Sequence, residues 1–357
     1  MHNTFLQKFG GIEYREFQNL ATLAFFFASL KHNTNAIMSE LLLKHRNVVD
    51  QLKITREAYK QCQSDKNDDN FDNAVYGFNY LHAFPFIEYR DLIFFPLPYL
   101  IADAVTDSLL TRATNADNSL REIIGRDVAQ AYIESIFKES NVYEEVLPEQ
   151  AYRVGKQKID SPDIMLKNGA NICFIDTKLS TPKLEIRKFN QEEIEKTIKK
   201  YARNVIQMYH RVKDFLDGYF YPFVNSVPIS PTSTFGIVAV LEDAYISRRQ
   251  IYAEAFNQLQ ITPDSSEAKF IMEHIKFTNF RDLEMFAFHS QDIFVALLAK
   301  AQNPKEWNDM GIHNSQLYAA TKSPRIASVE AFVATSRAVI LDFINEMVDK
   351  GIITKGS

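Results

Sequence analysis

A predicted β-hairpin between residues 161 and 180 (SPDIMLKNGANICFIDTKLS) constrains the fold more than any other segment. The dipeptide Asn168-Gly169 predicts its turn, because both residue types tolerate the positive φ that a tight hairpin turn demands. The second arm, Asn171 to Lys178, contains the apolar run ICFI, which is typical of a strand covered on both faces. We therefore expect an α/β (α+β) fold in which helices flank a mixed β-sheet.

Two carboxylates and one lysine are expected to meet at the open end of this hairpin. Asp176 and Lys178 are two residues apart, so they project from the same face of the strand. The hairpin brings Asp163 level with Asp176 on the neighbouring strand. Two close carboxylates repel each other and are costly to bury unpaired. A hard cation such as Mg²⁺ relieves that repulsion and prefers oxygen ligands, and a lysine beside it can hold a water or a phosphate oxygen.

Pro162-Asp163, followed by Asp176-Thr177-Lys178, resembles the signature of the PD-(D/E)xK nuclease superfamily. The resemblance implies a restriction-endonuclease-like core that hydrolyses phosphodiester bonds with Mg²⁺, for which Mn²⁺ is expected to substitute. It implies that Asp163 and Asp176 bind the metal, together with the main-chain carbonyl of Thr177, and that Lys178 is the catalytic lysine. The alternative interpretation is a surface hairpin with a solvated Asp–Lys pair, which contributes little.

A helix predicted from Ser119 to about Glu139 extends the resemblance. The superfamily commonly precedes its hairpin with a helix patterned Gly-x-x-x-aromatic-Glu-x-Tyr-Val, whose Glu completes the metal site. The residues at this spacing are Gly125, Ala129, Gln130, Tyr132 and Ile133. Gln130 replaces the Glu, so we expect a neutral contact from Gln130 within the site. The alternatives are that Asp127, Glu134 or Glu122 supplies the acid, that two carboxylates suffice, or that activity is reduced.

The segment from Lys183 to Lys213 is basic in an otherwise acidic chain. It has nine basic and four acidic residues, whereas the whole chain has a formal net charge of −5. Apolar residues recur at helical spacing from Ile194 onward, so we expect a helix beside the hairpin. Its basic residues can neutralise phosphates. The candidates for nucleic-acid contact are Lys183, Lys196, Lys199, Lys200 and Arg203; the alternative is a solvated face with Glu192–Lys196 and Glu195–Lys199 pairs.

The rest of the chain is expected to be largely helical, with one further strand-forming region on each side of the hairpin. We expect a helical, aromatic-rich N-terminal domain (1–114), a nuclease-like core (115–245) and C-terminal helices packing on the core (246–357). The expected strands lie within 144–153 and at 234–241. The expected helices cover 1–62, 100–111, 244–260, 267–277, 283–299 and 329–348. The aromatic side chains of 71–100 are expected to form a packing layer, with stacking on bases as the alternative.

Several other classes of protein are disfavoured. The two cysteines, Cys62 and Cys173, lack the spacing of a zinc site or a disulfide framework. The chain has no His-Glu-x-x-His motif, no Gly-x-Ser-x-Gly elbow and no phosphate-binding Gly-rich loop with Lys-Ser/Thr. Without a signal peptide or an apolar segment of membrane-spanning length, we expect a cytoplasmic protein that has no membrane partner.

DNA is the expected partner, and by analogy the chain is expected to act in restriction or antiviral defence against foreign DNA. The large aromatic residues and the long C-terminal helices are compatible with a homodimer. The alternative function is a catalytically weak or inactive nuclease-fold module that binds nucleic acid or a protein partner.

Overall fold

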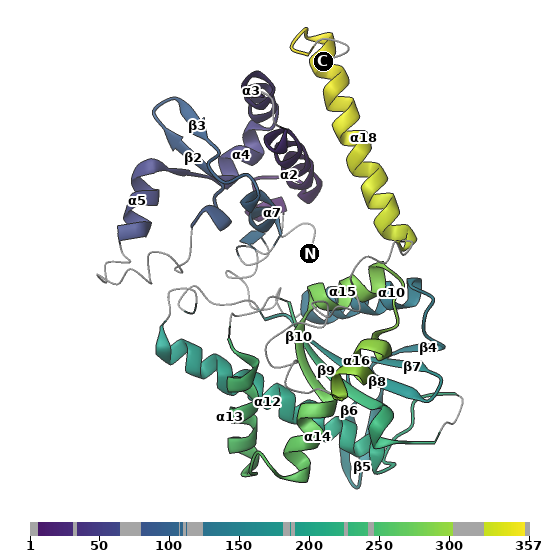
Figure 1. The fold of residues 1–357 in the computed structure, drawn as a ribbon. Coiled ribbons are helices and arrows are strands. Elements are labelled where there is room, and N and C mark those ends of the chain that lie inside the picture. Colours follow the sequence, from purple (N-terminus) through teal and green to yellow (C-terminus); the bar gives the residue numbers. More distant parts are fainter. Residues whose placement is uncertain are drawn as a thin grey trace. The chain divides into compact units, whose positions relative to one another are not determined.

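The computed structural model describes residues 6–30, 34–64, 80–106, 108–109, 112, 124–180, 186, 190–224, 228–241, 246–302 and 325–353. The chain divides into two compact units (Figure 1), Met1–Leu120 with Glu330–Ser357 (unit 1) and Arg121–Val329 (unit 2). The expected N-terminal segment 1–114 falls in unit 1. The expected core 115–245 falls almost entirely in unit 2, and the segment 246–357 is shared between the two units.

Unit 2 is built around a five-stranded sheet of order β10-β9-β8-β7-β4. Strands β4, β7 and β8 pair in antiparallel fashion, whereas β8, β9 and β10 are parallel. The expected mixed sheet within an α/β fold is therefore confirmed. The strands are β4 (Glu145–Pro148), β7 (Ile164–Asn168), β8 (Asn171–Lys178), β9 (Thr234–Val240) and β10 (Ile275–Asn279).

Helices cover both faces of this sheet (Figure 1), which is why its central strands are almost continuously apolar. Side chains of β8 alternate between the two cores: Phe174 packs with one face, and Cys173 and Ile175 pack with the other. Helices α12 (Gln191–Leu216), α13 (Arg248–Leu259) and α14 (Ser266–His274) belong to the Phe174 face. Helices α10 (Ala131–Glu139), α15 (Phe280–Phe288) and α16 (Ile293–Ala301) belong to the opposite face.

Helix α12 approaches β9 very closely. Its buried residues Tyr201, Val205, Met208 and Val212 recur at intervals of three and four, which places them on one face of the helix. Asn190 caps its N-terminus by accepting a hydrogen bond from Glu193 N–H at 3.1 Å. A Cβ atom added to Gly236 of β9 would lie 2.5 Å from Met208 Cγ, so only glycine permits this approach.

The structure differs from the sequence expectations at two places in unit 2. The strand expected within 144–153 is β4, but residues 151–160 form a further, separate hairpin of β5 (Ala151–Val154) and β6 (Gln157–Asp160) that was not expected. Its residues are largely exposed, so they lack the apolar alternation that identifies a half-buried strand. The helix expected over 267–277 ends at His274, and β10 begins at Ile275. The strand forms there because Ile275 and Phe277 pack in one core and the segment pairs with β9.

The helix expected over 283–299 is two helices, α15 and α16. Ser290 lies between them with a φ of 48°, outside the helical region. Asp292 then caps α16 by accepting a hydrogen bond from Phe294 N–H at 2.9 Å. Neither the turn nor the cap contains a glycine or a proline, so the sequence does not mark the break between the two helices.

Unit 1 combines helices with a small three-stranded sheet. Its helices are α2 (Tyr14–Ser29), α3 (Asn35–Lys44), α4 (Arg46–Leu52), α5 (Arg56–Ser64), α7 (Leu100–Val105) and most of α18 (Ala327–Asp349), with a 3₁₀ turn at Tyr80–His82. The sheet has the order β1 (Lys53–Thr55), β2 (Phe86–Tyr89) and β3 (Leu92–Phe94). The expectation of helix over 1–62 is thus wrong at β1, whose three residues are too few to show a strand period.

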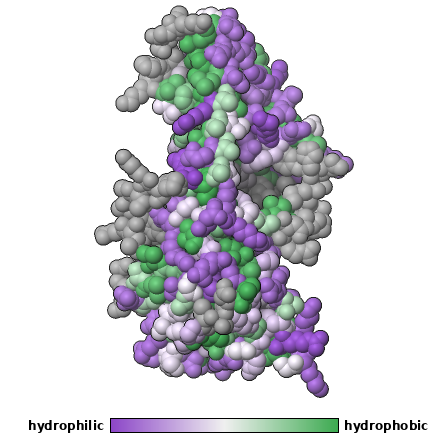
Figure 2. All heavy atoms as spheres, turned by 90° about the vertical axis from the view of Figure 1, so that its right-hand side faces the viewer, coloured by the Kyte–Doolittle hydropathy of each residue, from purple (hydrophilic) through white to green (hydrophobic). Residues whose placement is uncertain are grey.

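Helix α18 agrees with the helix expected over 329–348. Its residues Phe343 and Met347 are buried in the core of unit 1, together with Phe27 of α2. Figure 2, turned by 90° from Figure 1, shows hydrophobic residues interspersed among hydrophilic ones on the surface that faces the viewer. Phe332 and Leu341 of this helix are each 58% exposed.

Candidate functional site

The β7–β8 hairpin forms with a turn shifted by one residue from the expected position. Asn168 pairs with Asn171, so the turn residues are Gly169 and Ala170 rather than Asn168 and Gly169. Gly169 supplies the positive φ, 57°, that the turn requires. Asn168 remains in the strand because its side chain has another partner: Nδ2 donates a hydrogen bond to Asp292 Oδ2 at 2.8 Å.

The register of the hairpin places Asp163 opposite Asp176, since the next pair along the ladder is Ile164 with Ile175. Strand β8 continues beyond that pair, and its last residues pair only with β9. The Thr177 N–H on the β7 side therefore has no main-chain acceptor. The Asp163 carboxylate takes that place: Oδ2 accepts from Thr177 N–H and from Thr177 Oγ1, each at 2.6 Å. Asp163 is thus held at the end of the ladder by its side chain.

The surroundings of Asp163 shift the pKa of its carboxyl group. Burial raises its pKa to about 6, and the neighbouring Asp176 charge acts in the same direction. The two hydrogen bonds from Thr177 and the charge of Lys178 oppose this rise. Because the Asp176 charge disfavours the ionised form of Asp163, a positive charge beside both carboxylates would relieve that effect.

Asp176 and Lys178 form an ion pair at the end of β8. Lys178 Nζ lies 2.6 Å from Asp176 Oδ2, and both side chains leave the same face of the strand. The Asp176 side chain is buried, whereas 29% of the Lys178 side chain is exposed. Within the described part of the chain, no donor makes a well-directed hydrogen bond to Asp176 Oδ2, although the lysine charge is close. The solvated Asp–Lys pair considered as an alternative does not fit this burial.

Gln130 lies beside Asp163 but contacts its main chain. It ends a π-helical segment (Ile124–Gln130) that continues into α10, and its Nε2 donates to the carbonyl oxygen of Asp163 at 3.0 Å. A glutamate in this rotamer has no hydrogen to donate to a carbonyl. The amide therefore fixes the backbone from which the Asp163 carboxylate projects.

Of the other acidic candidates, the structure describes the side chain of Glu134 alone, and it does not join this group. Glu134 pairs with Lys138 one turn along α10. The side chain of Asp127 and all of Glu122 lie outside the described residues, as does Lys183. Within the described ranges, no group of three or more His, Cys, Asp or Glu side chains is arranged to hold a metal ion. Among the described residues, the carboxylate oxygens offered at this site are those of Asp163 and Asp176.

The basic residues of α12 fall into two sets. Lys196 pairs with Glu192 at 2.7 Å and with Glu193 at 3.0 Å, so it matches the solvated alternative. Lys200 is exposed and lies nearer the candidate site, because its Nζ is 3.4 Å from the hydroxyl of Ser180, two residues beyond Lys178. Lys199 and Arg203 are also exposed, and Arg203 Nε donates to the Lys199 carbonyl at 3.3 Å.

Two contributions to the site were not found from the sequence. The Thr177 hydroxyl holds Asp163, although strand alternation places Thr177 on the opposite face from Asp176. Ser180 joins the end of β8 to α12 through the buried Tyr201, whose hydroxyl is 3.3 Å from Ser180 Oγ. The contact of Thr177 with Asp163 follows from the extension of β8 beyond the start of β7. That extension could be predicted only from the register of the turn.

Comparison with family models, with curated proteins and with solved structures found no match for this chain. Among the described helices, none has the length and apolar character needed to cross a membrane.

Proposed function

We propose that this chain is a metal-dependent nuclease with a restriction-endonuclease-like core, acting on DNA. One observation carries the proposal: Asp163 and Asp176 lie on neighbouring strands at the same end of a buried hairpin, and Lys178 is paired with Asp176. The mixed sheet with helices on both faces supports it. By the same resemblance we propose that its substrate is foreign DNA. The cytoplasm remains the proposed location, as the sequence analysis suggested.

The pair of aspartates fits a magnesium-like ion. The Asp176 side chain is buried, Asp163 is partly buried, and the neighbouring Asp176 charge adds to the burial that raises the pKa of Asp163. A divalent cation would offset the repulsion that remains beside Lys178, and carboxylate oxygens are the ligands that Mg²⁺ prefers. Asp163 and Asp176 would hold the ion, the Thr177 carbonyl would add a ligand, and waters or substrate phosphate oxygens would complete the coordination.

The surrounding residues prepare the site for phosphodiester hydrolysis. A bound Mg²⁺ would supply Lewis acidity towards a water and a phosphate oxygen. Thr177 holds the Asp163 carboxylate and Gln130 holds its main chain. Lys178 is partly exposed, so its ammonium can hold the attacking water or a phosphate oxygen as negative charge develops. Asp176 keeps that ammonium at the end of β8.

Exposed basic residues beside the site would bind the substrate backbone. Lys199, Lys200 and Arg203 lie in the first half of α12, and Lys200 reaches the loop directly after the Asp-x-Lys strand. Contacts of this kind fix the position of a nucleic acid without reading its sequence.

Cleavage of labelled DNA, double- and single-stranded, tests the proposal. With Mg²⁺ or Mn²⁺ we expect cleavage that a chelator abolishes, and that falls by at least about 100-fold in Asp176→Asn and Lys178→Ala, the scale of losing one charge-stabilising group. Asp160→Asn is the matched control, because Asp160 is exposed and belongs to β6. Cleavage that survives both site substitutions would refute the assignment.

The second candidate is a nuclease-fold module that binds nucleic acid without cutting it. Gln130 is neutral and the site offers only two carboxylates among the described residues, which favours this alternative. It predicts salt-dependent DNA binding that is unaffected by chelation, and intact DNA with every metal tested. RNA oligonucleotides in the same assay establish which nucleic acid is preferred.

A further inference from the structure

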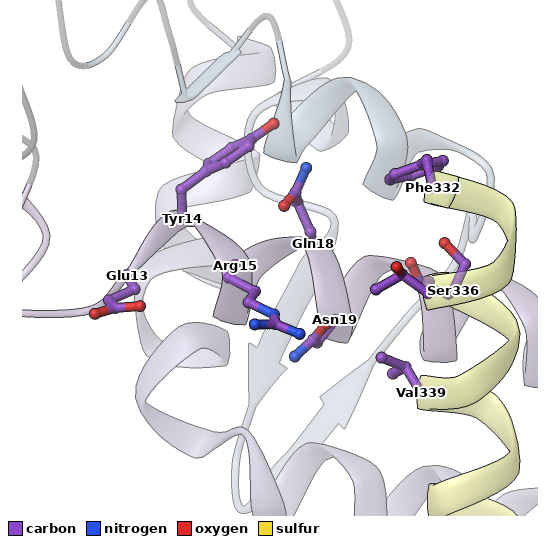
Figure 3. Close-up of a pocket in the computed structure, with 10 residues that line it drawn as sticks. Glu13, Tyr14, Arg15, Gln18, Asn19, Phe332, Ser336 and Val339 are labelled. Atoms are coloured by element: carbon purple, nitrogen blue, oxygen red, sulfur yellow. The ribbon is translucent and has the colours of Figure 1, made fainter. Parts of the chain in front are cut away.

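Unit 1 contains a pocket of ≈ 340 Å³ between α2 and the N-terminal half of α18 (Figure 3). This volume lies within the range of about 300–1,000 Å³ that is typical of small-molecule sites. Tyr14, Arg15, Gln18 and Asn19 line it from α2, and Phe332 and Ser336 line it from α18. The Asp163 group belongs to unit 2, so the pocket is a separate feature that the proposed nuclease activity does not use.

The half-buried part of the pocket presents two carboxamides. Gln18 and Asn19 are consecutive on α2, and neither side chain makes a hydrogen bond within the described part of the chain. Each carboxamide offers two N–H donors and one carbonyl acceptor. Ser336 adds a hydroxyl from the facing helix (Figure 3). A ligand with an edge of alternating donors and acceptors would satisfy these groups.

The rim of the pocket presents aromatic rings and a cation. The rings are those of Tyr14, which is 40% exposed, and Phe332, which is 58% exposed. In Figure 3 the ring of Phe332 extends from α18 over the side of the pocket where Gln18 lies. Arg15 is exposed and makes no ion pair within the described residues. Glu13, also on the rim, carries the opposing charge.

We propose that this pocket binds a nucleotide. The base would stack on Phe332 and present its hydrogen-bonding edge to Gln18 and Asn19, while the phosphate would lie at Arg15. Inorganic phosphate alone would leave the two amides and the ring unused. An apolar ligand would leave the amides and the guanidinium without partners, which is costly on burial. The ligand is either a free nucleotide or the terminal nucleotide of a strand, since the two share this chemistry.

Calorimetric titration of the full chain tests the proposal, with the four ribonucleoside 5′-monophosphates, the four nucleosides, inorganic phosphate and a short single-stranded oligonucleotide as separate probes. We expect at least one monophosphate to bind, its nucleoside to bind more weakly, and phosphate alone not to bind. An oligonucleotide that binds more tightly than its monophosphate, and whose binding Phe332→Ala weakens, identifies a strand terminus as the ligand; a monophosphate that binds more tightly, or oligonucleotide binding that Phe332→Ala leaves unchanged, identifies a free nucleotide.

Substitutions assign the binding to this pocket. Phe332→Ala is expected to weaken nucleotide binding about tenfold, from the loss of stacking. Arg15→Ala should remove the difference between nucleotide and nucleoside, and Glu13→Gln should strengthen nucleotide binding. Arg337→Ala is the control for Arg15→Ala, because Arg337 is an exposed arginine of α18 that does not line the pocket. The thermal midpoint of each variant shows whether it folds.

Two results would overturn the proposal: no binding of any nucleotide or oligonucleotide to the wild-type chain at millimolar concentration, or binding that Phe332→Ala and Arg15→Ala leave unchanged in folded protein. Asp176→Asn is expected to bind the nucleotide as the wild type does. A failure of the nuclease assignment and a failure of this one are therefore distinguishable.

Discussion

Asp163 completes the hydrogen-bond ladder of β8 with its side chain, because its Oδ2 accepts from the main-chain N–H of Thr177 at 2.6 Å. The carboxylate is thereby held beside Asp176, where both burial and the neighbouring charge disfavour its ionised form. A protein that keeps a carboxylate in such a position sacrifices stability there, which is common at functional sites.

Asp163→Asn is therefore expected to stabilise the fold in a pH-dependent way. The folded-state pKa of Asp163 is raised from 3.8 to about 6, so the stabilisation from its protonated form is complete below about pH 3.8 and is lost as the pH rises through about 6. At pH 8 the neutral amide, which still accepts from Thr177, should raise the free energy of unfolding by about 1–3 kcal/mol. Urea denaturation at pH 8 and pH 5 measures this. If the increase in the free energy of unfolding is as large at pH 5 as at pH 8, or if the variant is less stable at both pH values, the charged Asp163 carboxylate is not what destabilises the fold.

Gln130→Glu is expected to weaken the site, even though it introduces the acid of the superfamily pattern. The Gln130 amide donates to the Asp163 carbonyl, and a carboxylate placed there would face that oxygen without a hydrogen to donate. We expect the free energy of unfolding to fall by about 1–3 kcal/mol at pH 8. Denaturation together with the cleavage assay checks this. Faster cleavage in the glutamate variant would mean that Gln130 occupies a ligand position instead.

Gly236→Ala is expected to disrupt the contact between α12 and β9. The added methyl group would meet Met208 Cγ at 2.5 Å and Ile275 Cδ1 at 3.0 Å, so the helix or both side chains must shift. Overpacking of this kind costs about 1–3 kcal/mol. The double variant Gly236→Ala/Met208→Ala should recover part of that loss relative to the sum of the single variants. Purely additive free energies in a double-mutant cycle would show that the two residues do not compete for space.

DNA binding should depend unequally on the basic residues of α12. Lys200→Ala and Arg203→Ala are each expected to reduce the slope of log affinity against log salt concentration by about 0.9, the effect of one lost phosphate contact on duplex DNA. Lys196→Ala serves as the control, since Lys196 is already paired with Glu192 and Glu193. Binding measured by fluorescence anisotropy at several salt concentrations gives these slopes. If all three variants keep the slope of the wild type, the solvated-face interpretation holds for the whole helix.

The parts of the fold that the sequence predicted are those with long, regular apolar patterns. Helix α12 and helix α18 repeat apolar residues at helical spacing, and β8 and β9 are buried runs, so local sequence determines them. Strand β10 was not predicted. Ile275 and Phe277 are buried on one of its faces, but Lys276 and Thr278 are buried on the other. This mixed pattern is explained by the pairing of β10 with β9. Tertiary context decides such a segment.

The candidate site was predictable to the extent that strand geometry fixes it. The two-residue separation of Asp176 and Lys178 and the length of the hairpin placed these residues beside Asp163. The contact of Gln130 with a main-chain carbonyl, and that of Thr177 with Asp163, depend on where β7 begins and on the path of the π-helical segment. Neither feature has a sequence signature of its own.

The central claim, that Asp163 and Asp176 together bind a divalent ion, is tested most directly by Mn²⁺ titration followed by electron paramagnetic resonance. We predict that the wild-type chain and the Asp160→Asn control bind Mn²⁺ more tightly as the pH rises through about 6, where Asp163 ionises, and that Asp163→Asn and Asp176→Asn lose this binding. Binding that is the same in the wild type and in both site variants, or no binding to the wild type above pH 7, would contradict the account.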